Sequence, residues 1–237
     1  DRNYPSDACS VQAAIGAVNA VAFDISAACA GFIFAMNIVE GFFKAGIYKT
    51  ALIIGAETLS KVTDWSDRGT CVLFGDGAGA AVLKAEETGI IDMMMGADGT
   101  KGDVLACTSR TVGNFLTGTK PELGFMTMDG QEVFKFAVRK VPESVLELLS
   151  RTGTKKEDIK YYVLHQANER IIEAAARRLK EPMEKFPMTI SRFGNTSTAS
   201  IPLLLDDMIQ KDMLKRGDKI IMSGFGAGMT WGAVLME

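Results

Sequence analysis

Two reactive side chains, a cysteine and a histidine, occupy equivalent places in two strand-then-helix patterns. Cys29 follows an apolar run at residues 22–25 and three small residues, and a helical pattern begins at it. His165 follows the apolar run at residues 161–164, and a helix is expected after it as well. In open α/β sheets, sites form outside the carboxyl ends of strands. Both side chains are therefore expected at a functional site.

Cys29 has the surroundings of a nucleophile. Its neighbours in the AACAGF segment at residues 27–32 are small except for Phe32. A helix N-terminus carries roughly half a positive charge and free backbone N–H groups. Both favour the thiolate, which predicts a pKa below the usual ~8.5 and a sulfur able to attack a thioester. The same N–H groups could hold the developing oxyanion. Read alone, a cysteine among alanines is more often a packed core residue.

His165 and Asn195 are the polar candidates that could assist this cysteine. His165 is the only histidine and stands in the HQAN segment at residues 165–168, so mechanisms needing two imidazoles are excluded for this chain. Asn195 stands in the GNTSTAS segment at residues 194–200. Each also has an ordinary interpretation. The histidine could be a satisfied core residue, and Gly-Asn could be a turn whose Ser and Thr residues cap the next helix.

Hydrophobic spacing predicts the elements that must position these residues. A helix starting at Cys29 has apolar residues every three or four positions and stops near Gly46, and further helices are expected at residues 131–149, after His165, and at 199–214. Apolar runs at residues 51–55 and 77–83 have the same layout as those at 219–223 and 232–235, which indicates an internal duplication. Strands alternating with helices predict an α/β fold with buried sheets.

Composition excludes several classes of function. The net charge is −3, without the excess of positive charge that broad nucleic-acid binding requires. No apolar run reaches the ~18 residues of a membrane span, and no signal-peptide pattern is visible, so a cytoplasmic location is expected. The four cysteines form no CxxC pair, which argues against a zinc or dithiol site. The glycine-rich segment at residues 75–79 is GxGxG rather than a dinucleotide fingerprint.

Taken together, five segments resemble a known family. They are AFDI and AACAGF at residues 22–32, LFGDGA at 73–78, HQAN at 165–168, GNTS at 194–197 and GFGAGMTWG at 224–232. The chain resembles the condensing enzymes of the thiolase superfamily, most closely β-ketoacyl-acyl-carrier-protein synthase III. The resemblance implies a thiolase-like, duplicated α-β-α-β-α layered architecture with halves at residues 1–95 and 96–237. Family members carry roughly eighty further residues before the point matching Asp1, so an incomplete N-terminal half with exposed sheet edges is expected.

The resemblance implies a two-stage reaction of type II fatty acid synthesis. Cys29 would take an acyl group from acyl-CoA, and malonyl-acyl-carrier-protein would then lose CO2 and attack the acyl-enzyme. His165 and Asn195 would hydrogen-bond the malonyl thioester carbonyl as enolate charge develops. No cofactor and no metal are implied.

Other positions are assigned by the same resemblance. Phe74 would line the acyl pocket, and Tyr4 would reach across a homodimer into the partner's pocket. The closing loop, with Phe225, Ala227 and Gly228, would contribute to substrate binding and the oxyanion hole. The expected contacts to the acidic carrier protein and to CoA phosphates are Gln166, Arg170, Arg177 and Arg178.

Three alternatives remain open from sequence. The chain could be a related Cys-His-Asn acyltransferase of secondary metabolism, which a carrier-protein preference would separate. It could be an inactive truncated scaffold, in which case acetyl-CoA would leave no mass on Cys29. A Cys-His-Asn hydrolase is the third alternative, and the surrounding motifs count against it.

Overall fold

The computed structural model describes residues 4–108, 111–122 and 124–237. Its largest sheet has four strands in the order β3-β8-β7-β6, and β1 pairs with β2 and β4 with β5 in two smaller sheets. The strands are β1 (Thr50–Glu57), β2 (Gly77–Lys84), β3 (Ile90–Ala97), β4 (Leu105–Cys107), β5 (Met126–Met128), β6 (Ile159–Leu164), β7 (Lys219–Gly226) and β8 (Thr230–Met236). The helices are α1 (Asp7–Ala14), α2 (Gly31–Lys44), α3 (Gly130–Thr152), α4 (Glu169–Leu179), α5 (Ile190–Phe193) and α6 (Ser200–Gln210).

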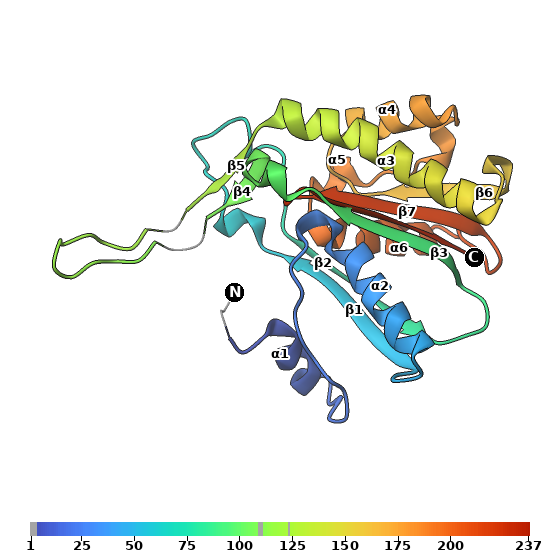
Figure 1. Ribbon diagram of the computed structural model, residues 1–237, viewed down its shortest axis with the longest axis horizontal. Coiled ribbons are helices and arrows are strands. Elements are labelled where there is room, and N and C mark those ends of the chain that lie inside the picture. The colour runs from blue at the N-terminus through green and yellow to red at the C-terminus, as the bar shows by residue number, and fades with distance from the viewer. Residues whose placement is uncertain (1–3, 109–110, 123) are drawn as a thin grey trace.

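Helices α2, α3, α4 and α6 divide between the two faces of the four-stranded sheet (Figure 1). Strand β7 shows why, because its successive side chains point to opposite faces. Ile221 and Phe225 pack into the core beneath α3 and α4, whereas Ile220 and Met222 pack into the core formed with α2 and α6. This second core also takes in Ile53 of β1. Helices α2 and α6 therefore lie between the four-stranded sheet and the β1–β2 pair, in the layered thiolase-like arrangement expected from sequence.

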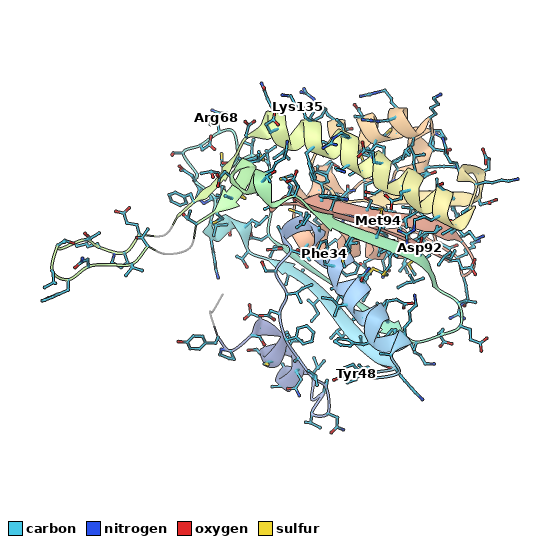
Figure 2. The ribbon with its side chains drawn as sticks, viewed as in Figure 1. Phe34, Tyr48, Arg68, Asp92, Met94 and Lys135 are labelled. Atoms are coloured by element: carbon cyan, nitrogen blue, oxygen red, sulfur yellow. The ribbon has the colours of Figure 1, made fainter. Side chains whose placement is uncertain are left out.

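Side chains of the four-stranded sheet pack against the long helix α3 and bind it. Met94 of β3 packs against the core beneath α3, and Asp92 on the same strand accepts a hydrogen bond from Arg151 at 2.9 Å (Figure 2). Helix α3 begins where the Asp129 carboxylate accepts from the Gln131 and Glu132 N–H groups, and it ends at Gly153 with φ +67°. The predicted apolar stripe of this helix is buried throughout.

The duplicated strand pairs are confirmed by their hydrogen bonding. β1 pairs antiparallel with β2, and β7 pairs antiparallel with β8. β6 runs parallel to β7, so the carboxyl ends of both strands meet at one edge. β3 pairs with β8, which places residues 90–97 in the C-terminal sheet, across the expected division at residue 95.

Two local expectations are wrong. Residues 22–25 form no strand, because no described strand pairs with them and a ladder needs a neighbour. The carboxylate of Asp24 in this run instead accepts from the backbone N–H groups of Asp7 and Ala8, which caps α1. Helix α6 ends at Gln210 rather than residue 214, because Asp212 adopts φ +54°. None of the described helices combines the length and apolar character needed to cross a membrane.

Candidate active site

One cavity of about 200 Å³ brings together the three residues singled out from sequence. Cys29, His165 and Asn195 all line it, although they lie on separate segments of the chain. The wall is otherwise mostly apolar and consists of Gly69, Leu73, Phe74, Leu105, Met128, Gly130, Val133, Phe134, Ala167, Asn168, Ile171, Phe225 and Gly226. The predicted convergence is therefore what the structure shows.

Cys29 lies in a tight turn that precedes α2. A 3₁₀ turn at Ala28–Ala30 carries it, and Ala28 has φ +46°, a left-handed conformation that non-glycine residues adopt only when their surroundings enforce it. Two hydroxyl groups hold the turn in place. Thr198 Oγ1 donates to the Ala28 carbonyl at 2.7 Å, and Thr230 Oγ1 donates to the Ala27 carbonyl at 3.2 Å.

Burial decides the ionisation of Cys29. The pKa of the thiol is raised to about 11, mainly by burial and to a smaller extent by the negative charge of Glu57. Hydrogen bonds from Ser197 and from the cysteine's own backbone lower it, but by less. The expected depressed pKa is therefore wrong. The apolar wall disfavours the anion more than the start of α2 favours it. Cys29 rests as a thiol at neutral pH.

His165 is a neutral imidazole fixed by three contacts. It follows β6, and its backbone N–H donates to the Ser223 carbonyl at 2.8 Å. Its Nδ1 lies 2.6 Å from Ser200 Oγ, and its ring packs edge-on against Phe225 with centroids 5.4 Å apart. The side chain is 2 % exposed, and this burial lowers its pKa to about 3. It can therefore act at neutral pH as a hydrogen-bonding group without a charge.

Asn195 is held by its backbone and oriented by its side chain. Its N–H donates to the Leu73 carbonyl at 2.8 Å, and its carbonyl accepts from Gly75 at 2.9 Å. Side-chain Oδ1 accepts the backbone N–H of Ser197 at 2.9 Å. Because a backbone N–H can only donate, this contact identifies the oxygen, and the amide NH2 remains as a donor on the cavity side.

The other residues expected near the substrate divide into two groups. Phe74 and Phe225 line the cavity, as expected. In the closing loop the lining residue is Gly226, whereas Ala227 and Gly228 are partly exposed and stand outside the lining among the described residues. Tyr4 is 85 % exposed, and its predicted reach into a partner's pocket stays a prediction.

The expected carrier-protein contacts also divide. The contact expected at Gln166 is wrong, because this side chain is buried and both ends of its amide are hydrogen-bonded within the protein. Nε2 donates to the Leu164 carbonyl at 2.8 Å, and Oε1 accepts the Thr189 N–H at 2.9 Å. It therefore supports the turn after His165 rather than meeting a partner. Arg170, Arg177 and Arg178 are exposed on α4, where a partner could reach them.

Sequence reasoning missed much of the wall and the residues that support the reactive groups. Leu105, Met128, Val133, Phe134 and Ile171 come from four elements and carry no local signal of a pocket. Glu57, Ser197 and Ser200 were also missed, although Ser197 and Ser200 stand in the same short segment as Asn195. Within the described part of the chain, no cluster of three His, Cys, Asp or Glu side chains could hold a metal.

Comparison with known proteins gives consistent matches. The family model "3-Oxoacyl-[acyl-carrier-protein (ACP)] synthase III" matches residues 23–99, and its C-terminal counterpart matches residues 149–237. The β-ketoacyl-[acyl-carrier-protein] synthase III of Clostridium novyi is 53 % identical over 98 % of this chain and 72 % of its own length. That of Clostridium acetobutylicum is 51 % identical over 100 % of this chain and 74 % of its own length.

Solved structures of related enzymes have the same fold. The 3-oxoacyl-[acyl-carrier-protein] synthase III of Aquifex aeolicus superposes with a TM-score of 0.91 at 45 % identity, covering 100 % of this chain and 73 % of that one. The priming β-ketosynthase of the R1128 polyketide pathway superposes with a TM-score of 0.89 at 33 % identity, covering 99 % of this chain and 71 % of that one. The chain therefore belongs to the β-ketoacyl-[acyl-carrier-protein] synthase III family.

Proposed function

We propose that this chain is a condensing acyltransferase that starts type II fatty acid synthesis. Cys29 accepts an acyl group from acyl-CoA, and malonyl-acyl-carrier-protein then loses CO2 and attacks that acyl group to give 3-oxoacyl-carrier-protein. The observation that carries the proposal is the convergence of one sulfur and two neutral hydrogen-bonding groups, His165 and Asn195, in a single cavity.

Acyl transfer to Cys29 needs a thiolate for the moment of attack. The sulfur attacks the thioester carbonyl, the bond from that carbonyl to the CoA sulfur breaks, and the proton of the thiol ends on the departing CoA sulfur, so that no net charge is left. We expect backbone N–H groups of Cys29 and of the loop at Gly226 to receive the oxyanion that forms on the carbonyl, because both residues line the cavity. The high resting pKa keeps the sulfur protonated until a thioester fills the cavity.

Decarboxylation calls for donors that face the malonyl thioester carbonyl. As CO2 leaves, its bonding electrons form an enolate, and negative charge gathers on that oxygen. The Asn195 amide and the neutral His165 imidazole donate to it, and the apolar wall strengthens both hydrogen bonds by excluding water. The carbanion then attacks the acyl carbon on Cys29, and the sulfur leaves as the new carbon–carbon bond forms.

Exposed cations next in sequence to residues that line the cavity suit an acidic carrier protein. Arg170 stands in the first turn of α4, directly before the lining residue Ile171. Arg68 and Lys135 adjoin the lining residues Gly69 and Phe134, and both lie at the end of the molecule where α3 begins (Figure 2). We therefore include the carrier protein and acyl-CoA as partners, with a cytoplasmic homodimer as the working assembly and no cofactor.

Intact-mass spectrometry tests the first stage. The protein is mixed with acetyl-CoA, and a gain of one acetyl group on Cys29 is expected, with Cys29→Ala as the unlabelled control. The acylated protein is then mixed with malonyl-carrier protein or malonyl-CoA, and faster release of the acetyl group as 3-oxoacyl product is expected with the carrier protein. A folded protein that gains no mass would support the scaffold alternative.

A second candidate shares the same three residues. The similarity to the priming ketosynthase of a polyketide pathway favours a related Cys-His-Asn acyltransferase of secondary metabolism. The two candidates differ in what they extend, so a panel of acyl-CoA primers with one carrier protein of each pathway separates them. Turnover confined to the polyketide carrier protein would favour the second candidate.

A further inference from the structure

Ser200 contacts the His165 ring at Nδ1, in the buried part of the site. The hydroxyl oxygen lies 2.6 Å from His165 Nδ1 and accepts the backbone N–H of Gln166 at 3.3 Å. Both side chains are 2 % exposed. The contact at Nδ1 is therefore shielded from water, and the hydrogen bond must be satisfied by these groups alone.

The hydroxyl has one proton, and its partners determine where that proton goes. The Gln166 N–H can only donate, so it occupies a lone pair of Ser200 Oγ. Among the described residues, Nδ1 is the sole group in hydrogen-bonding contact with Ser200 Oγ that can accept a proton. If Nδ1 carried a hydrogen instead, the buried hydroxyl proton would have no acceptor. Ser200 therefore donates to Nδ1.

We propose that Ser200 is a positioning residue that holds His165 in the tautomer with hydrogen on Nε2, so that Nε2–H points into the cavity as a donor. The opposite tautomer would direct a lone pair at the oxygen that becomes negative during decarboxylation, and it would repel the enolate. The inference deepens the proposed function, on which its kinetic part rests. It assigns Ser200 to the decarboxylation stage and leaves acylation of Cys29 independent of it.

The single histidine makes the tautomer directly measurable. A tag-free protein labelled with ¹⁵N-histidine has one imidazole, and long-range ¹H–¹⁵N correlation spectra distinguish the nitrogen that carries hydrogen from the one that does not. At pH 7.5 the unsubstituted protein is expected to show hydrogen on Nε2 alone. Hydrogen on Nδ1, or an even mixture, would overturn the inference without any variant having to fold.

Substitution then tests whether Ser200 is the cause. Ser200→Ala is expected to give a tautomer mixture and at least about a tenfold loss of malonyl-carrier-protein decarboxylation, because a misplaced imidazole proton is costly in catalysis. Acylation of Cys29 should change less than about twofold, because the Ser200 hydroxyl contacts His165 and Gln166 and makes no hydrogen bond to Cys29 among the described residues. Ser200→Thr retains the hydroxyl and should retain both the spectrum and the decarboxylation.

A matched control is available at another buried serine. Ser144→Ala removes a hydroxyl that donates to the Lys140 carbonyl within α3, and it should leave the His165 spectrum and decarboxylation unchanged. If Ser200→Ala keeps hydrogen on Nε2 and decarboxylates normally, the inference is wrong. A protein that shows the Nε2 tautomer but neither accepts acetyl groups nor decarboxylates malonyl-carrier protein would contradict the proposed function and leave the role of Ser200 in the tautomer intact.

Discussion

Gly226 lies so close to Cys29 that a methyl group on its α-carbon would stand 2.6 Å from the Cys29 backbone nitrogen. Real Cβ atoms do not approach backbone nitrogen this closely, so a side chain at this position must displace the turn that carries the sulfur. The end of β7 and the nucleophile turn are thus fitted to each other.

Gly226→Ala should therefore slow acylation of Cys29 by at least about tenfold, because small displacements of reacting groups are costly. The rate of acetyl transfer from acetyl-CoA, followed by intact mass, measures the effect. Gly41→Ala is the matched control, since Gly41 is exposed on α2 with no atom within 4 Å of the added methyl. That control should stabilise the protein by about 0.5–1 kcal/mol and leave acylation intact. Equal acylation rates for both variants would contradict the fit.

The raised pKa of Cys29 predicts an unusual pH profile for its alkylation. With a pKa of about 11, the iodoacetamide rate at Cys29 should climb about tenfold per pH unit between pH 7 and 9 without a plateau. The alkylation rate of an exposed thiol would level off at a pH above its usual pKa of ~8.5. Peptide mass spectrometry separates Cys29 from the exposed Cys9 and Cys107. A plateau below pH 9 at Cys29 would show that the thiolate is stabilised after all.

Glu57 supplies a test of the cause of that pKa. Its Oε1 accepts from Ser197 Oγ at 3.0 Å, and its negative charge raises the pKa of Cys29. Glu57→Gln should therefore lower that pKa and speed alkylation of Cys29 at pH 8. Glu147→Gln changes a carboxyl group far along α3 and should leave the rate unchanged. A slower reaction in Glu57→Gln would mean that Glu57 acts mainly by holding the Ser197 turn.

Asn195 offers a change of one atom that separates its two functions. Asn195→Asp keeps the oxygen that accepts the Ser197 N–H and replaces the donor NH2 with a charged oxygen. Decarboxylation of malonyl-carrier protein should fall by about 10²-fold or more, as on removal of an oxyanion donor, while the fold is kept. Carbon dioxide release and thermal unfolding measure the two outcomes.

The same substitution elsewhere provides the control for Asn195. Asn114 in the exposed segment between β4 and β5 uses only its side-chain oxygen, which accepts from the N–H groups of Leu116 and Thr117. Asn114→Asp preserves those contacts and should leave decarboxylation unchanged. If Asn195→Asp also decarboxylates at the normal rate, the amide nitrogen is not a donor to the substrate.

Local patterns predicted the reactive groups, because the information for them is local. Cys29 and His165 each follow an apolar run and precede an amphipathic helix, and both features can be recognised within about twenty residues. The strand expected at residues 22–25 was wrong because a strand needs a partner, which no local pattern supplies. The lowered thiol pKa was wrong for a related reason. It was inferred from the helix that Cys29 precedes, whereas burial by distant elements decides it.

The cavity wall lay beyond sequence reasoning for a geometric reason. Leu105 and Met128 face each other across the short β4–β5 pair, in register with each other, and Val133 comes from the first turn of α3. Each has the spacing of an ordinary core residue. Only the packing of these elements over the ends of β6 and β7 turns their side chains into a wall. The supporting roles of the Ser197 and Ser200 hydroxyls could not be recognised from sequence either, because serines at this position are also expected simply to cap the next helix.

The neutral, buried His165 predicts how stability depends on pH. Its pKa is lowered by burial to about 3 in the folded protein and is near 6.5 in the unfolded chain. Between these values the unfolded chain binds a proton that the folded protein does not. The free energy of unfolding must therefore rise with pH across this window, by up to about 1.4 kcal/mol per unit.

The contribution of His165 is measured by urea unfolding of the unsubstituted protein and of His165→Asn at intervals from pH 4 to 7.5. Carboxylates whose pKa is lowered in the fold, such as Asp98, also give stability that is lost as the pH falls, and they do so in both proteins. The slope for the variant should be shallower than that for the unsubstituted protein between pH 4 and 6.5. Parallel curves would mean that His165 is charged, or accessible to water, in the folded state.

Charge reversal on α4 tests the docking of the carrier protein. Arg170 is exposed and directly precedes the lining residue Ile171, so Arg170→Glu should raise the KM for malonyl-carrier protein several-fold, because rim charges act mainly on encounter. The effect should shrink as salt is raised from about 0.05 to 0.5 M, since screening removes it. Arg216→Glu is the matched control, since this exposed arginine precedes β7 and so lies at the opposite end of the strand from Gly226. Acylation by acetyl-CoA reports whether CoA shares the site, because a carrier-specific contact would leave it unchanged in Arg170→Glu. An equal rise in KM for both variants, or one insensitive to salt, would place the carrier protein on another surface.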